Sequence, residues 1–248
     1  MNPFVQQLED RKLLSATLAS GVLTVEGTKY NDNITVSLSA DGSQITVTQA
    51  KTRRRGRTAG TPTTTTFAAS DVTSISINGG AGNDNISLRS LGTTALSTPA
   101  NILGGDGNDA ISSGAGNDTI DGGAGDDKIR AGAGNDSVDG GDGNDNITGG
   151  DGADTVNGGD GDDNIYTAGD STVDVVDGGA DSADTGEADQ DQVVADTTDV
   201  VDTVTNAVTV VGSSGGDHVG GGHHHHGGHH HGGGGGDLAG TFGTRRIA

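Results

Sequence analysis

The sequence contains no cysteine and no tryptophan, only three prolines, and so few aromatic residues that they make up 2% of its 248 positions. Without cysteine the chain has neither disulfide bonds nor a thiolate metal site. Because only 29% of the residues are hydrophobic, a thick conventional core is not expected. No run of 18 or more apolar residues occurs, so we expect no transmembrane segment.

Positive charge is also scarce, since 13 Lys and Arg residues stand against 35 Asp and Glu residues and give a net charge of −22 at pH 7. Such a charge argues against nucleic acid and anionic membranes as partners. All acidic residues except Glu9, Glu26 and Glu187 are aspartates, which favour turns. Low hydrophobicity with a high net charge is typical of disordered chains, unless a repeat pattern overrides the composition.

Glycine is abundant, with 47 residues, and much of it belongs to a repeat. From Gly104 to Tyr166, seven consecutive nine-residue copies follow the pattern G-G-x-G-x-D-x-U-x, in which U is Ile or Val. Every copy has glycine at its fourth position and aspartate at its sixth. An eighth copy stands apart at Gly79–Ile86. The periodicity predicts a stack of similar structural units.

The residue types at these positions suggest an ion. Glycine permits turns with positive φ and close approach of neighbouring backbones. Such a turn exposes carbonyl oxygens on its concave side, where the sixth-position aspartate adds carboxylate oxygens. Calcium takes roughly six to eight oxygen ligands, more than one turn supplies. An ion held here must therefore be shared between stacked turns.

The array resembles the RTX, or haemolysin-type, calcium-binding nonapeptide repeats. The resemblance covers residues 79–87 and 104–166 and implies an all-β fold, a right-handed parallel β-roll in which two repeats complete one coil. It also implies that each ion is shared by aspartates two repeats apart. The five pairs are then Asp109 with Asp127, Asp118 with Asp136, Asp127 with Asp145, Asp136 with Asp154, and Asp145 with Asp163.

From this resemblance we expect about five or more calcium ions and a roll that folds on binding them. The expected ligands are the sixth-position aspartates, glycines at the first or second position, and aspartates at the third. They are Asp84, Gly104, Asp106, Asp109, Gly114, Asp118, Gly122, Asp127, Gly132, Asp136, Gly140, Asp142, Asp145, Gly149, Asp151, Asp154, Gly158, Asp160 and Asp163.

Around the array we expect five segments: a leader (1–15), a β-rich cap (16–78), the roll (79–169), an acidic β-rich cap (170–211) and a Gly/His-rich tail (212–248). In the first cap, alternating patterns predict strands at 22–25, 33–38 and 44–48, with a hairpin turn at 40–43. The leader is either a cleaved signal peptide or an ordinary flexible segment.

Three irregular stretches carry further expectations. Residues 27–34 resemble a degenerate repeat that keeps Asp32 but has Tyr30 in place of glycine, and we expect a strand without a calcium turn there. The basic run 51–57 is interpreted as a solvated loop tip, continued by residues 61–66 up to a strand at Phe67. Ile102 falls at an eighth position but Ala100 stands where aspartate belongs, so we expect the roll to continue there as a strand without an ion, with the preceding insertion as a surface loop.

No catalytic motif stands in a plausible context. H-E-x-x-H is absent, and the literal G-x-S-x-G at 212–216 lies in a Gly/Ser stretch with no predicted helix. We therefore predict a non-enzymatic, secreted or cell-surface protein with a structural or adhesive role and a surface or matrix partner. One alternative is Zn or Ni binding through the eight histidines between His218 and His231. The other is a non-catalytic module of a toxin or enzyme system.

Overall fold

The computed structural model describes residues 15–53, 57–167, 172–179, 192–194 and 200–201. These residues form strands, turns and one short 3-10 segment, η1 (Ala69–Asp71). The strands are β1 (Ser15–Ala19), β2 (Val22–Thr28), β3 (Asp32–Leu38), β4 (Gln44–Arg53), β5 (Arg57–Ala68), β6 (Ser74–Ala81), β7 (Asn85–Ser90), β8 (Ala100–Asp106), β9 (Ala110–Ser112), β10 (Thr119–Ala124), β11 (Lys128–Ala133), β12 (Ser137–Asp142), β13 (Asn146–Asp151), β14 (Thr155–Asp160), β15 (Asn164–Tyr166), β16 (Val175–Asp177), β17 (Gln192–Val194) and β18 (Val200–Val201).

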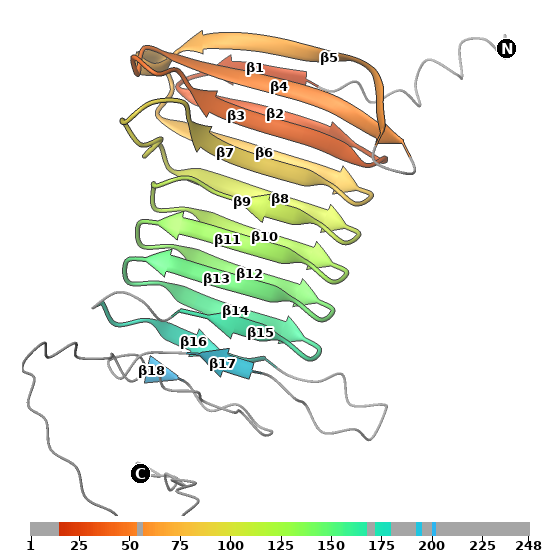
Figure 1. Ribbon diagram of the computed structural model, residues 1–248, viewed down its shortest axis with the longest axis vertical. Helices are drawn as coiled ribbons and strands as arrows, with labels where there is room; N and C mark the ends of the chain where they lie inside the picture. The colour runs from red at the N-terminus through yellow and green to blue at the C-terminus, as the bar shows by residue number, and fades with distance from the viewer. Residues whose placement is uncertain (1–14, 54–56, 168–171, 180–191, 195–199, 202–248) are drawn as a thin grey trace, which may run out of the picture. The chain divides into compact units, whose positions relative to one another are not determined.

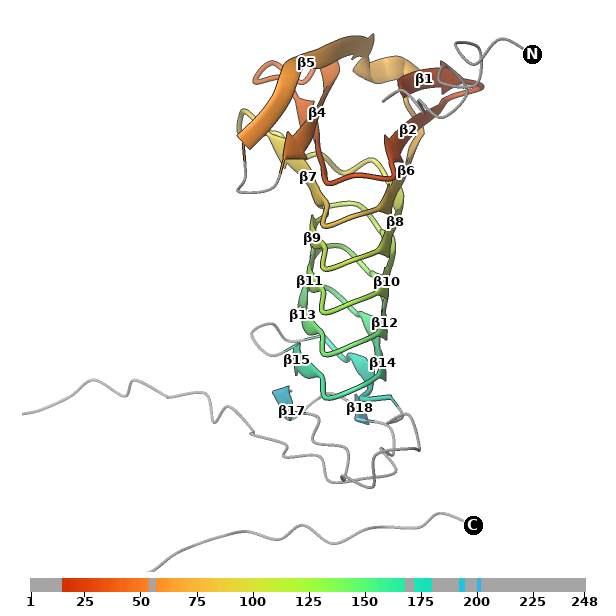
Figure 2. The same ribbon diagram turned by 90° about the vertical axis from the view of Figure 1, so that its right-hand side faces the viewer.

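The strands form two sheets that face each other (Figures 1 and 2). One has the order β1-β2-β6-β8-β10-β12-β14-β16-β18, and the other β17-β15-β13-β11-β9-β7-β3-β4-β5. From β6 onward, consecutive strands alternate between the sheets and every neighbouring pair within a sheet is parallel. The chain therefore coils as a parallel β-roll, which confirms the predicted fold class.

The eighth-position residues set the register and fill the space between the sheets. Ile120 pairs with Ile102 on one side and with Val138 on the other, so identical positions stack one coil apart. Ile111, Ile120, Ile129 and Ile147 are each at most 1% exposed. Each repeat thus contributes one large apolar side chain to a narrow core.

Glycine is required where adjacent coils touch. Gly123 has φ +107°, and a Cβ at that residue would lie 2.1 Å from the carbonyl oxygen of Gly105 in the preceding coil. Any side chain there would be strained by the backbone conformation and would collide with a neighbouring backbone. The fourth-position glycines other than Gly116 have the same constraint, as at Gly125 (φ +124°).

The N-terminal region adds antiparallel strands to both sheets. β1 pairs antiparallel with β2, and β4 pairs antiparallel with β3 on one side and with β5 on the other. β2 and β3 then pair parallel with β6 and β7, so this mixed β region continues directly into the roll. The three predicted strands and the hairpin turn around Gly42 (φ +72°) are confirmed.

The prediction of a loop at residues 61–66 is wrong, because β5 runs without interruption from Arg57 to Ala68. Threonine has a high β propensity, and Pro62 is tolerated because β5 is the outermost strand of its sheet and lies beside a bulge near Gln49. Residues 51–53 of the basic run belong to β4 and Arg57 begins β5, whereas residues 54–56, where the loop tip was predicted, lie outside the described part. Lys51 Nζ lies 5.4 Å from the centroid of the Tyr30 ring.

The strand predicted around Ile102 and the insertion predicted before it are both present. Ile102 in β8 stacks between Ile77 and Ile120, and residues 91–99 lie outside the strands. Within this insertion Leu91 is exposed, whereas Leu96 is buried. Beyond Tyr166, β16 and β17 pair parallel with β14 and β15, so both sheets continue past the last regular repeat.

Candidate calcium site

The sixth-position aspartates and Asp174 are buried, with between 0% and 3% of each residue exposed. They form two rows, each following one line of turns between the sheets. The long row consists of Asp32, Asp84, Asp109, Asp127, Asp145 and Asp163, and the short row consists of Asp118, Asp136, Asp154 and Asp174.

In every row member except Asp32, one carboxylate oxygen accepts a backbone N–H from the preceding coil and so holds that coil in register. The backbone N–H of Asp109 donates to Oδ1 of Asp127 at 2.7 Å, and the N–H of Asp127 donates to Oδ1 of Asp145 at 2.7 Å. In the short row the N–H of Asp118 donates to Oδ1 of Asp136 at 2.8 Å. All five pairs implied by the RTX resemblance are joined in this way.

The other carboxylate oxygen has no protein partner in five of these residues, although it is buried. These atoms are Oδ2 of Asp84, Asp109, Asp127, Asp136 and Asp145. A buried acceptor without a donor costs about 1–3 kcal/mol, and more when it is charged. Buried polar atoms in folded proteins nearly always have a partner, and a bound cation is a partner that suits a carboxylate oxygen.

Burial also raises the pKa of these carboxyl groups. The pKa rises to about 8 for Asp84, about 7 for Asp109 and Asp145, and about 6 for Asp127 and Asp136. Desolvation is the largest cause, and neighbouring aspartates add repulsion, as Asp127 does at Asp109. The anionic form is therefore unfavourable unless a cation accompanies it.

Backbone oxygens converge on the same small space. A Cβ built on Gly104 would lie 2.6 Å from Oδ2 of Asp109 and 2.4 Å from the carbonyl oxygen of Gly122. The same cradle recurs one coil further, where a Cβ on Gly122 would lie 2.5 Å from Oδ2 of Asp127 and 2.4 Å from the oxygen of Gly140. The donors are all hard oxygens, which suits calcium.

Within the described residues, no three His, Cys, Asp or Glu side chains converge in the manner of a metal cluster. An ion in a cradle would therefore take much of its shell from backbone carbonyls. Gly140, Gly149 and Gly158 each face Oδ2 of their own aspartate (Asp145, Asp154 and Asp163), at 2.3, 2.6 and 2.2 Å from the built Cβ.

The remaining expected ligands lie elsewhere in the turns. Gly114 and Gly132 occupy second positions and approach each other across coils, since a Cβ on Gly132 would lie 2.2 Å from the oxygen of Gly114. The third-position aspartates have exposed side chains that do not belong to the two rows. The backbone carbonyl of each accepts a hydrogen bond from the N–H of a fourth-position glycine in the neighbouring coil. These residues are Asp106, Asp142, Asp151 and Asp160.

Two features of the site are not predicted by the regular repeat. Asp174 extends the short row by accepting the N–H of Asp154 at 2.8 Å, but it stands 20 residues further along instead of 18. The fragment D-x-U-x-G-G at 174–179 is the sequence signal that could have revealed Asp174.

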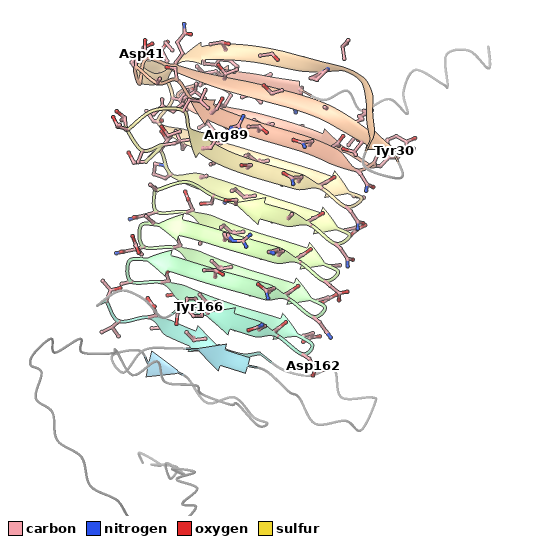
Figure 3. All side chains as sticks on the ribbon, in the orientation of Figure 1. Tyr30, Asp41, Arg89, Asp162 and Tyr166 are labelled. Atoms are coloured by element: carbon pink, nitrogen blue, oxygen red, sulfur yellow. The ribbon has the colours of Figure 1, made fainter. Side chains whose placement is uncertain are left out.

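Fifth-position side chains also form an outer ladder, in which the N–H of Asn144 donates to Oδ1 of Asp126 at 3.1 Å. In Figure 3, Asp162 marks the edge of the roll where this ladder runs, and Tyr30 lies at the same edge.

The family model of the RTX calcium-binding nonapeptide repeat matches residues 76–89, 103–138 and 139–173. These segments of the chain are RTX calcium-binding nonapeptide repeats. Comparison with curated proteins and with solved structures gave no match. The described part of the protein contains no helix that is long and apolar enough to cross a bilayer. The expected leader up to residue 14 and the whole Gly/His-rich tail, including His218 to His231, lie outside the described residues.

Proposed function

We propose that this protein is a secreted or cell-surface, non-enzymatic protein with a structural or adhesive role, whose roll folds on binding calcium outside the cell. The observation that carries the proposal is the set of buried, unpartnered carboxylate oxygens along the two rows. RTX repeats bind calcium, and these oxygens are where this chain offers an acceptor that the protein itself leaves unsatisfied.

The residues that would hold the ions are those of the cradles. Neighbouring aspartates of one row would share an ion with the carbonyl groups of first-position glycines, as between Asp109, Asp127 and Gly122. Bound calcium would neutralise the carboxylates and satisfy their second oxygens together. Extracellular calcium modules bind with dissociation constants of roughly 10⁻⁴–10⁻³ M. With such an affinity the roll would stay unfolded at the low calcium concentration inside the cell and would fold on binding calcium after export.

The test is far-UV circular dichroism of the full chain during titration from chelator to about 10 mM calcium, a concentration above the affinity range of such modules. We expect a cooperative gain of β structure with calcium and none with magnesium, which demands a smaller octahedral site. A spectrum that calcium leaves unchanged, folded or unfolded, would contradict the proposal.

A paired substitution locates the ions. Asp127→Asn together with Asp145→Asn should shift the calcium midpoint upward by roughly 10-fold or more, since ligand-supporting groups commonly have effects of that size. Asp121→Asn with Asp139→Asn removes the same charge from exposed positions on the outer face of the sheet and serves as the control. Equal shifts in both variants would assign the effect to net charge rather than to the cradles.

A further inference from the structure

The two rows differ at the first position of their repeats. Along the long row this position is always glycine, at Gly79, Gly104, Gly122, Gly140 and Gly158. Along the short row it is Ser113, then Ala131, and only then Gly149. A side chain at this position enters the cradle, because a Cβ built on Gly104 falls within 2.6 Å of the Asp109 carboxylate.

Ser113 contacts the carboxylate that its own repeat supplies. Its Oγ donates to Oδ2 of Asp118 in a short hydrogen bond, and it also lies 2.8 Å from the carbonyl oxygen of Ala131. The N–H of Gly114 donates to the same Oδ2 at 3.2 Å. This oxygen therefore has two protein donors, whereas Oδ2 of Asp109 and Oδ2 of Asp127 have none.

One carboxylate oxygen of Asp32, in the first turn of the long row, has similar donors, although Oδ1 of Asp32 is buried without a protein partner. Oδ2 of Asp32 accepts the hydroxyl of Thr28 at 2.7 Å and the N–H of Thr28 at 2.6 Å. The nearby Lys51 adds a favourable charge at this carboxylate. Both turns therefore combine a second-position N–H with a hydroxyl group at one carboxylate oxygen.

We propose that the Ser113 hydroxyl substitutes for a calcium ion at Asp118, so that this turn of the roll closes without metal. The inference rests on the proposed calcium-binding function and adds to it by assigning which position lacks an ion. The hydroxyl satisfies the oxygen that calcium would otherwise bind, and the serine methylene fills part of the cradle. In the long row the second carboxylate oxygen has no protein donor at Asp84, Asp109, Asp127 and Asp145, so the two edges of the roll take up calcium unequally.

Native mass spectrometry of the full chain at saturating calcium counts the bound ions and tests this assignment. Ser113→Gly opens the cradle, and we expect it to bind one ion more than the wild-type protein. Ser113→Thr keeps the hydroxyl and should leave the count unchanged. Gly122→Ser places the same hydroxyl beside Asp127 in the long row, where the backbone φ does not demand glycine, and should lower the count by one.

The outcomes separate this inference from the function on which it rests. A wild-type chain that binds no calcium would overturn both. A wild-type chain that binds calcium while Ser113→Gly gains no ion would overturn the Ser113 assignment alone. Circular dichroism in calcium checks that each variant folds, and the Ser113→Gly count decides the question even where Gly122→Ser does not fold.

Discussion

The N-terminal region (residues 15–78) and the repeat array (residues 79–167) belong to the same two sheets but are held together differently. The N-terminal region buries a cluster of large apolar side chains: Leu23, Val25, Ile34, Val36, Leu38, Ile45, Val47, Val72, Ile75 and Ile77. Its strands reach 10 residues in β4 and 12 in β5. From β9 onward the array strands have three to six residues, and each repeat buries one Ile or Val.

The buried polar groups also differ between the N-terminal region and the array. In the N-terminal region the buried Gln49 reaches from β4 across the interior to the carbonyl of Glu26 in β2 at 3.2 Å. Thr28 donates to one carboxylate oxygen of Asp32, whose other oxygen is buried without a protein partner. In the array, buried carboxylates of like charge face one another with unpartnered oxygens. The comparison teaches that one fold is stabilised by apolar packing at its start and, under the proposed function, by ions along its length.

Removal of calcium should have the largest effect, because we expect it to open the array while the N-terminal region stays folded. Hydrogen exchange of the full chain, followed by mass spectrometry, should show amides between residues 101 and 165 exchanging about 100-fold faster or more in chelator, because local opening there approaches zero cost. Amides of β2, β3 and β4 should keep most of their protection. Equal loss of amide protection in both regions would show that the N-terminal region does not stay folded without the array.

Much of this organisation is predictable, because the nine-residue period fixes which residues stack. Asp109 and Asp127 lie 18 residues apart and meet in the roll. Periodicity does not predict the local exceptions. Asp174 follows a spacing of 20 residues, and the contact between Ser113 and Asp118 depends on how the turn closes. The loop prediction for residues 61–66 fails because the pairing partner of an edge strand is not visible in its own sequence.

In calcium-free protein, acidification should stabilise the array and so reduce the difference in stability between the two regions. Folded-state pKa values of about 6 to 8 at Asp84, Asp127 and Asp145 lie above the ordinary value of 3.8. The native array therefore binds more protons than the unfolded chain. Its stability is fully present below pH 3.8 and is lost as pH rises through about 6 to 8.

Circular dichroism without calcium should accordingly show more β structure near pH 4 than near pH 8, with the change confined to the array. Asp127→Asn with Asp145→Asn removes two of the titrating groups and should flatten the pH profile. A calcium-free chain that gains β structure as pH rises would contradict the assigned direction of these pKa shifts.

The smallest effect expected is that of single core truncations, and it depends on the region. Ile34 in β3 and Ile129 in β11 are both fully buried, so either change to Ala should cost about 2–5 kcal/mol where the surrounding structure is folded. In calcium, both variants should therefore melt at lower temperature. In chelator, only Ile34→Ala should lower the remaining melting transition, because Ile129 then lies in an array that is already open. If Ile129→Ala lowered that transition equally, the array would be folded without calcium, and apolar packing rather than ions would account for its stability.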